Sequence, residues 1–272
     1  MRIGLFGAGR LGSAVMSAAR GAGHEIVWAL EGPGDPPSKP DIALDASHAS
    51  GVAAHLEWAR RTGCPIVIGT TGWDKGLLEG AATWGIGVMV SPNFSLGVAF
   101  MRRAALALGR FAALTDPSVV AGGAGSPLAA GVAGQAVAGQ AVAGQAVDLA
   151  ILERHHNKKA DAPSGTAKLL AEALVEGDRE GGGPFDGWVM GAARPGKVNM
   201  ASLRAGDEVG YHEMRYESAA ETIVFSHDAH SRAVFATGAV RALEWMAGKK
   251  GLYSFDDFAA SLIDPLFSKV PS

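Results

Sequence analysis

The first strand-like run of the chain, RIGLF, ends in the glycine-rich loop GAGRLG, and a helical pattern begins directly after it. This order of strand, glycine loop and helix predicts a βα unit of a parallel sheet and suits a bound dinucleotide. Gly7 allows a tight turn, Gly9 lets a pyrophosphate approach the backbone and the helix N-terminus, and Gly12 lets the helix pack closely on the strand. An ordinary glycine turn in an α/β fold is the alternative. The residues expected to contact the dinucleotide are Gly7, Ala8, Gly9, Arg10, Leu11 and Gly12.

An acidic residue, Glu31, ends the second strand-like run, about 20 residues beyond the loop, as the dinucleotide fingerprint requires. Its carboxylate would accept hydrogen bonds from the hydroxyl groups of the adenosine ribose and would repel a 2′-phosphate. The residues that follow, Gly32-Pro33-Gly34, supply no arginine to hold such a phosphate. The sequence therefore predicts that NADH is preferred to NADPH.

The arrangement of strand-like and helical segments differs between the two halves of the chain. Up to about residue 116, the strand-like runs RIGLF, EIVWALE, DIALDAS, PIVIGTT and GVMVSP alternate with helical patterns near 11–22, 51–62, 74–84 and 95–113. This alternation predicts a parallel sheet covered on both faces, which is the Rossmann type of α/β fold. From residue 148 a strand and a helix at 164–176 are followed by three strand-like runs joined by short polar turns, which indicate a mixed or antiparallel sheet. We therefore expect two domains.

An unusual segment, 117–147, separates these two regions of the chain. It carries no charged residue and repeats Val-Ala-Gly-Gln-Ala at 132–136, 137–141 and 142–146. A membrane span needs about 20 strongly apolar residues, and this segment is too weakly hydrophobic to be one. Its glycines disfavour a helix, so a flexible insertion is the better interpretation, with a weak alanine-rich helix second.

Two further strand ends carry polar motifs, IGTTG at 68–72 and SPNFS at 91–95. Ligands of open α/β sheets lie at the carboxyl ends of the strands, so both loops are expected to line the nicotinamide end of the cofactor. Turns whose polar groups are satisfied internally are the alternative for each loop. The residues concerned are Gly69, Thr70, Thr71, Ser91, Pro92, Asn93 and Phe94.

Positive charge gathers before a helix start in ILERHHNKKADAPSGTAKLL, residues 151–170. The backbone N–H groups of Ser164, Gly165 and Thr166 can bind an anion at the positive end of the helix. Beside them stand four basic residues, and a histidine is a suitable proton donor near neutral pH. The motif predicts a carboxylate-bearing substrate; a solvated basic turn is the alternative, and joint metal ligation is disfavoured because adjacent histidines of a strand point to opposite faces. The basic residues are His155, His156, Lys158 and Lys159.

The composition of the chain argues against several classes of binding partner. A net charge of −3 gives no basic patch for nucleic acid, and the single cysteine, Cys64, leaves no disulfide framework or cysteine-based metal site. The opening residues lack a signal-peptide pattern. We expect a cytoplasmic protein with no nucleic-acid, membrane or metal partner, and we give Asp45, His227 and His230 structural roles only.

Taken together, these motifs resemble the dihydrodipicolinate reductase family, whose signature is E-x-H-H-x-x-K-x-D-x-P-S-G-T-A. The resemblance continues in IGTTGWD, NFSLGV, RAGDEVG and SHDAHSRAVFATGAVRALEW, although the glycine loop is one residue shorter than the usual one and the connection after Glu31 is brief. The residues that match the signature are Glu153, His155, His156, Lys159, Asp161, Pro163, Ser164, Gly165, Thr166 and Ala167.

The resemblance implies an NAD(P)H-dependent reductase that acts on a cyclic imine dicarboxylate in lysine and diaminopimelate synthesis. It implies a dinucleotide-binding domain at 1–116 and 233–272, and an α+β substrate and oligomerisation domain at 148–232 that forms a homotetramer through its sheet. His155 would donate the proton with Lys159 as its catalytic partner. His156 would bind substrate carboxylate with Ser164, Gly165 and Thr166. Another NAD-dependent dehydrogenase of the same fold and a non-catalytic NAD-binding sensor remain as alternatives.

Overall fold

The computed structural model describes residues 1–32, 34–116 and 147–268, so nearly all of the predicted insertion at 117–147 lies outside the described residues. The chain divides into two compact units. The first comprises Met1–Leu96 and Ser231–Ser272, and the second comprises Gly97–His230. Each unit has its own sheet and is described separately.

The first unit is built on a parallel sheet in which β1 lies between β2 and β3, with Phe6 beside both Leu30 and Asp45. Short apolar runs form these strands, and β3 and β4 are buried along their whole length, as in a sheet covered on both faces. All the described strands of this sheet run in the same direction. In spatial order they are β11 (Gly251–Ser254), β5 (Gly87–Val90), β4 (Ile66–Ile68), β3 (Ile42–Asp45), β1 (Arg2–Phe6) and β2 (Glu25–Leu30).

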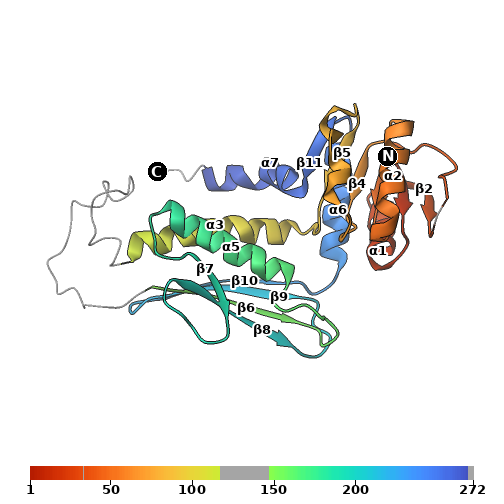
Figure 1. The fold of residues 1–272 in the computed structure, drawn as a ribbon. Coiled ribbons are helices and arrows are strands. Elements are labelled where there is room, and N and C mark those ends of the chain that lie inside the picture. Colours follow the sequence, from red (N-terminus) through yellow and green to blue (C-terminus); the bar gives the residue numbers. More distant parts are fainter. Residues whose placement is uncertain (33, 117–146, 269–272) are drawn as a thin grey trace. The chain divides into compact units, whose positions relative to one another are not determined.

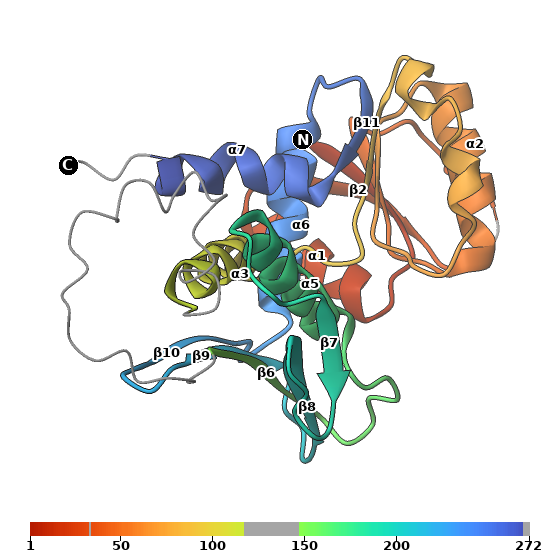
Figure 2. The same ribbon diagram turned by 60° about the vertical axis from the view of Figure 1, so that its left-hand side comes forward.

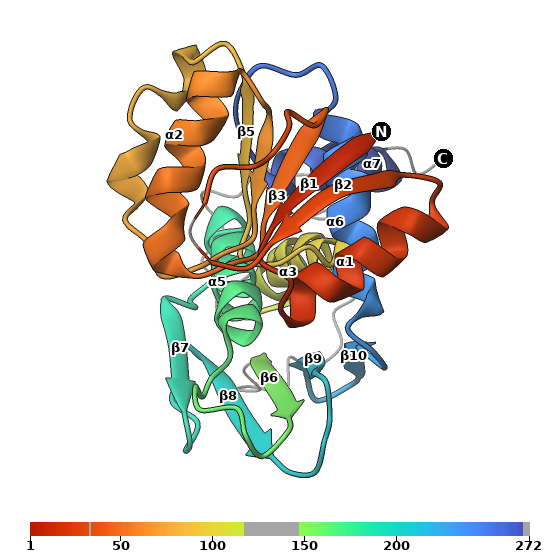
Figure 3. The ribbon, with the colours of Figure 1, turned by 90° about the vertical axis from the view of Figure 1, so that its right-hand side faces the viewer.

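Helices cover both faces of this sheet (Figure 3). Helix α2 lies on one side, and α1 and α6 pack against each other on the other side. Phe6 packs edge-on against Trp28 and Trp58 in the core beneath α2. The helices are α1 (Arg10–Gly21), α2 (Val52–Thr62), α6 (Ala233–Met246) and α7 (Phe255–Ser268), with short 3₁₀ turns at Ala49–Gly51, Lys75–Leu78 and Ala81–Thr83.

The helix predicted near 74–84 is wrong, because that segment holds only two of these 3₁₀ turns. Gly80 separates the turns and adopts a positive φ of 72°, and Gly85 ends the segment with a φ of 74°. Residues without a Cβ adopt this left-handed conformation easily, and it interrupts an α-helix. The apolar spacing that suggested the helix was therefore outweighed by its glycines.

The second unit has a mixed sheet covered on one face by two helices, α3 (Leu96–Thr115) and α5 (Gly165–Glu180) (Figures 1 and 2). Strand β6 lies at its centre, parallel to β8 and antiparallel to β9. In spatial order the strands are β10 (Thr222–Asp228), β9 (Tyr211–Glu217), β6 (Asp148–His155), β8 (Lys197–Arg204) and β7 (Gly187–Met190). The mixed or antiparallel sheet expected from the sequence is thus present.

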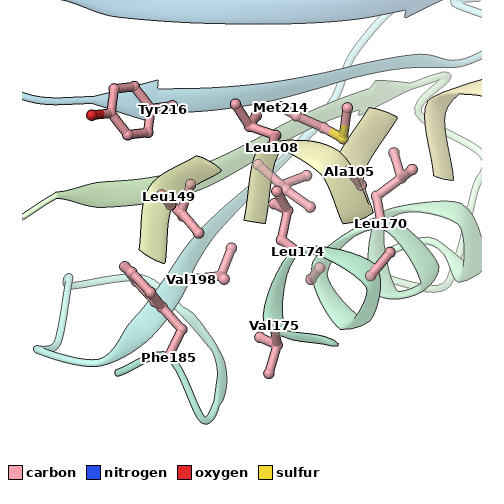
Figure 4. Packing of buried hydrophobic residues seen from close by; sticks show 14 of the residues in the cluster. Ala105, Leu108, Leu149, Leu170, Leu174, Val175, Phe185, Val198, Met214 and Tyr216 are labelled. Carbon is pink, nitrogen blue, oxygen red and sulfur yellow. The ribbon is translucent and has the colours of Figure 1, made fainter. Parts of the chain in front are cut away.

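Helix α3 contributes to the core of this second unit (Figure 4). Its Ala105 and Leu108 pack with Leu149 of β6, Met214 of β9 and Leu174 of α5. The predicted boundary at residue 116 therefore differs from the structural division after Leu96. The sequence of an amphipathic helix shows that it has an apolar face, but it does not show which of two sheets that face packs against.

The inner face of β6 changes in character along the strand. Alternate side chains point toward the helices, and the buried series runs from Leu149 and Ile151 to Glu153 and His155. The first two residues belong to the hydrophobic core, and the last two are polar. The same strand face that anchors the core thus carries polar side chains to the start of α5.

These observations confirm the predicted fold class, a Rossmann-type domain with a second α+β domain. In the described part of the chain, no helix has the length and hydrophobicity needed to cross a membrane.

The core of the second unit contains a buried carboxyl group, Asp178 of α5. One oxygen accepts a hydrogen bond from the backbone N–H of Phe185 at 2.7 Å, and the other has no hydrogen-bond partner among the described residues. Burial, together with the negative charge of Asp116, raises the pKa of Asp178 to about 6. Since folding raises this pKa above its ordinary 3.8, the group favours the fold at low pH and loses this contribution as the pH rises through about 6.

We expect Asp178→Asn to remove this pH dependence, because an amide keeps the shape of the side chain and does not ionise. Between about pH 5 and pH 8 the wild-type protein should lose roughly 1–2 kcal/mol of stability relative to the variant. Urea unfolding at both pH values measures the difference. Asp148→Asn, at an exposed position, is the control and should follow the wild type. Parallel pH profiles for wild type and Asp178→Asn would contradict the prediction.

Candidate active site

The glycine loop of the first unit has the geometry of a phosphate cradle. Gly7 adopts a φ of 93°, and a Cβ there would lie 2.4 Å from the carbonyl oxygen of Ala46. A Cβ on Gly12 would lie 2.0 Å from the carbonyl oxygen of Gly7, so α1 can approach the loop only with glycine at this position. By contrast, a Cβ on Gly9 would meet nothing within 4 Å. The backbone before α1 is therefore open to a ligand, and no side chain caps the helix at Gly9.

A cavity of about 500 Å³ lies beside this loop, at the carboxyl ends of β1, β2 and β3. It is lined by Gly7 from the loop, by Leu30 and Gly32 from either side of Glu31, and by the rings of His55 and Trp58 from α2. Glu31 itself is exposed directly after β2. The loop, the cavity and the position of Glu31 fit the dinucleotide expected from the sequence.

The floor of this region is organised by Asp45, which is fully buried at the end of β3. It accepts hydrogen bonds from the hydroxyl groups of Ser47 (2.6 Å) and Thr70 (2.7 Å) and from Nδ1 of His55 (2.7 Å). Burial opposes its ionisation, but these hydrogen bonds outweigh burial and hold the pKa of Asp45 below its ordinary value. These contacts anchor the segment after β3, in line with the structural role expected for Asp45.

The loops after β4 and β5 lie at the same edge of the sheet, and several of their side chains are engaged internally. The Thr70 hydroxyl bonds Asp45, and the Ser91 hydroxyl donates to the carbonyl oxygen of Asn93. Phe94 is buried beneath Gly69, whose missing Cβ would otherwise lie 2.8 Å from the Phe94 ring. For these residues the structure favours backbone contacts to a ligand. Thr71 is exposed, and Pro92 lies between Ser91 and Asn93.

In the second unit, His155 ends β6 with only 8% of its surface exposed. Its Nδ1 donates a short hydrogen bond to Oε2 of Glu153, a carboxylate that is completely buried. Burial lowers the pKa of His155, and the nearby Glu153 carboxylate only partly opposes this effect. His155 therefore has one ring nitrogen bound and the other, Nε2, without a hydrogen-bond partner among the described residues.

Arg204 of β8 holds the other oxygen of Glu153 at 2.6 Å. The same guanidinium nitrogen donates to the carbonyl oxygen of Asp161 at 2.7 Å, so it ties β8 to the loop before α5. Burial of Glu153 opposes its ionisation, but the hydrogen bond and the charge of Arg204 help to outweigh this and lower its pKa. The buried carboxylate is thus ionised and paired.

Ser164 caps α5 instead of facing a ligand. Its hydroxyl oxygen accepts from the N–H of Ala167 at 3.2 Å, and it is hydrogen-bonded to Nε2 of His212 at 3.1 Å. Only 2% of the Ser164 surface is exposed. The substrate contact predicted for Ser164 is through its backbone N–H and stays a prediction. Gly165 is exposed, and a Cβ there would meet nothing within 4 Å.

The remaining predicted residues lie in the loop between β6 and α5 or in the first turn of α5. The Lys159 ammonium group pairs with Asp161 at 2.8 Å, and its charge is close enough to contribute to lowering the pKa of His155. The backbone N–H of His156 donates to the carbonyl oxygen of Glu208 at 2.8 Å, and Nδ1 of His156 is buried without a partner among the described residues. Thr166 lies in the first turn of α5. The predicted substrate residues thus lie in one loop and in the first turn of the helix that follows it.

Sequence reasoning missed two members of this cluster, Arg204 and His212. His212 of β9 stands opposite Glu153 in the sheet register, and its ring centroid lies 5.1 Å from that of His155. Burial, with the charge of His155, lowers the pKa of His212 to about 3, so it is neutral near pH 7. The only signal in the sequence is their place in and beside RAGDEVG, a segment that resembles the family but indicates no chemical role by itself.

Candidate metal-ligand atoms of Glu153, His155 and His212 lie within 4.8 Å of one another. Glu153 is already paired with Arg204, and Nδ1 of His155 is already bound to Glu153. A cation at this point would have to compete with the guanidinium group. We assign no metal role to these side chains, and the expected absence of a metal stays a prediction.

A Rossmann-type unit with an open phosphate cradle, joined to a unit that sets a histidine beside a helix N-terminus, defines a pyridine-nucleotide-dependent reductase of two domains. The family comparison agrees: residues 1–94 match the dihydrodipicolinate reductase N-terminus and residues 131–259 match its C-terminus. The chain belongs to the dihydrodipicolinate reductase family, as its motifs predicted.

Relatives named 4-hydroxy-tetrahydrodipicolinate reductase support this membership. The protein of Gluconobacter oxydans is 35% identical over 94% of this chain and 96% of its own length. The protein of Akkermansia muciniphila is 32% identical over 92% of this chain and 93% of its own. A solved structure, a dipicolinate-bound dihydrodipicolinate reductase from Paenisporosarcina sp. TG-14, shares the fold with a TM-score of 0.68 at 21% identity, covering 94% of this chain and 98% of that one.

Proposed function

We propose that the protein catalyses the reduction of 4-hydroxy-tetrahydrodipicolinate, with His155 as the proton donor. One observation carries the assignment of His155: its Nδ1 is held by a buried carboxylate, while Nε2 has no hydrogen-bond partner among the described residues. The loop that follows His155 leads to the exposed start of α5 at Gly165. The names of the relatives supply the substrate class, a cyclic dicarboxylate.

The chemistry requires one hydride and one proton. Loss of the 4-hydroxyl group as water leaves a conjugated cyclic imine, and adding a hydride and a proton to it gives tetrahydrodipicolinate. A bound nicotinamide supplies the hydride, and the loops at Gly7–Gly12, Gly69–Thr71 and Ser91–Phe94 would hold the cofactor. His155 supplies the proton, and a proton from water restores it. Gly165, Thr166 and His156 bind the carboxylates, with Lys159 adding positive charge.

We also propose the finer points that the sequence suggested. Glu31 favours NADH over NADPH, and the protein acts in the cytoplasm as a homotetramer. The sheet of the second unit supports assembly, because Leu203 of β8 and Val224 of β10 remain 49% and 42% exposed on the face opposite the helices. Light scattering coupled to gel filtration tests the tetramer, and a monomer at micromolar concentration would contradict it.

The test of function is a steady-state assay that follows NADH absorbance, with the substrate generated in situ from pyruvate and aspartate semialdehyde. We expect oxidation of NADH that depends on the generated substrate. A dehydrogenase that acts on another imine or amino acid would not oxidise NADH with this substrate, but would do so with its own substrate. An NAD-binding sensor would bind NADH and turn over neither, and either result would overturn the proposal.

A further inference from the structure

Glu153 divides its two carboxylate oxygens between two partners. Oε2 accepts the hydrogen on Nδ1 of His155, and Oε1 accepts from Arg204 at 2.6 Å. The carboxylate has no solvent exposure, and a buried charge persists only where such partners satisfy it. Arg204 is fixed in turn by the carbonyl oxygen of Asp161. The three side chains therefore form an ordered chain that ends on one nitrogen of the histidine.

We propose that Glu153, held by Arg204, is a positioning residue that keeps the hydrogen of neutral His155 on Nδ1 and leaves Nε2 as the one nitrogen that takes up and delivers the catalytic proton. The kinetic part of this inference rests on the proposed function. A carboxylate that orients an imidazole fixes both its ring plane and its tautomer.

The surroundings of Nε2 support this assignment. A Cβ on Gly210 would lie 3.0 Å from Nε2 of His155, so the absence of a side chain at this position leaves space beside that nitrogen. The ring of His212 packs edge-on against the His155 ring, with an interplanar angle of 74°. Through its ring contact, His212 limits rotation of His155, and the hydrogen bond to Ser164 fixes His212.

The charged and titratable groups that face His155 determine the sign of the pH effect. They are Glu153 on its own strand, Arg204 on β8, His212 on β9 and Lys159 in the loop that follows β6. His212 is neutral near pH 7, and the two cations disfavour the imidazolium. Glu153 is the carboxylate that opposes them, so removal of its charge should lower the pKa of His155 further. Activity that requires the imidazolium should then decline at lower pH.

The kinetic test compares Glu153→Gln with Glu213→Gln. Glu213 is also paired with an arginine in this sheet, but it neighbours His212 on β9 and so points to the opposite face. For Glu153→Gln we expect kcat to fall roughly 10- to 100-fold with KM for NADH within about twofold, and the high-pH decline of kcat to move down by about one pH unit. Glu213→Gln should keep the wild-type profile. An unshifted profile for Glu153→Gln would overturn the inference.

A second measurement does not depend on catalytic turnover. Long-range ¹H–¹⁵N correlation spectra of ¹⁵N-histidine-labelled wild-type protein distinguish the two neutral tautomers, and the signal missing from His155→Gln identifies His155. We expect the hydrogen on Nδ1 above the His155 pKa. A hydrogen on Nε2 would overturn the inference. If the wild type lacked reductase activity, the proposed function would fail while this spectrum still decided the tautomer.

Discussion

His155→Gln should lower kcat by roughly 10²- to 10⁴-fold, because a positioned general acid typically contributes that much to a reaction. Glutamine retains a polar side chain of similar length but cannot deliver a proton. The affinity for NADH should remain close to that of the wild type, because the cofactor loops belong to the first unit and His155 to the second. Stopped-flow or steady-state kinetics with the in situ substrate, and fluorescence titration with NADH, measure the two quantities.

A matched control for this variant is His230→Gln, at a histidine whose side chain is 88% exposed. That variant should retain wild-type turnover. Turnover of His155→Gln within twofold of the wild type would remove His155 from the mechanism. Equal loss of NADH affinity and turnover would instead indicate a folding defect, which circular dichroism would reveal.

Glu31→Ser combined with Gly32→Arg should shift the ratio of kcat/KM for NADPH over NADH by roughly 100-fold toward NADPH. The wild-type carboxylate lies directly after β2 and repels a 2′-phosphate, whereas Gly32 lines the adjoining cavity. Serine removes the repulsion, and arginine adds a charge-assisted partner for the phosphate. Because Glu31 is exposed, salt should weaken the wild-type discrimination.

Glu25→Ser is the control for this pair, since it removes an exposed acidic residue at the opposite end of the same strand. It should leave the cofactor ratio unchanged. If the wild type used NADH and NADPH equally, the proposed role of Glu31 would be wrong. A cation elsewhere around the cavity, such as Arg61, which pairs with Asp35 at 3.1 Å, would then be the candidate phosphate partner.

The dinucleotide unit could be predicted in some detail because its signals are local. The loop at Gly7–Gly12 joins a strand to a helix within a few residues, and its turn and close packing require glycine wherever they occur. The failures were of two kinds. Residues 74–84 have helical apolar spacing but glycines in left-handed conformations, and α3 has an apolar face whose partner sheet is formed much later in the chain.

Only the part of the candidate substrate site that is formed by residues adjacent in the sequence could be predicted. The signature around His155 and Ser164 indicated an anion site at a helix start, but the bonds that organise it cross strands. Arg204 reaches Glu153 over 51 positions of sequence, and His212 reaches Ser164 over 48. Strand register decides such contacts, and register is not visible in any short window. The hydrogen bond between the Ser164 hydroxyl and His212 is the clearest example.

The proposed reaction adds a hydride from NADH to a cyclic dicarboxylate. The most direct measurement is mass spectrometry of the product formed with NADH that carries deuterium at the transferred position of C4. We expect tetrahydrodipicolinate that contains one deuterium from the cofactor, formed by the wild type and at least about 100-fold more slowly by His155→Gln. Unlabelled product, or oxidation of the cofactor without a reduced dicarboxylate, would contradict it.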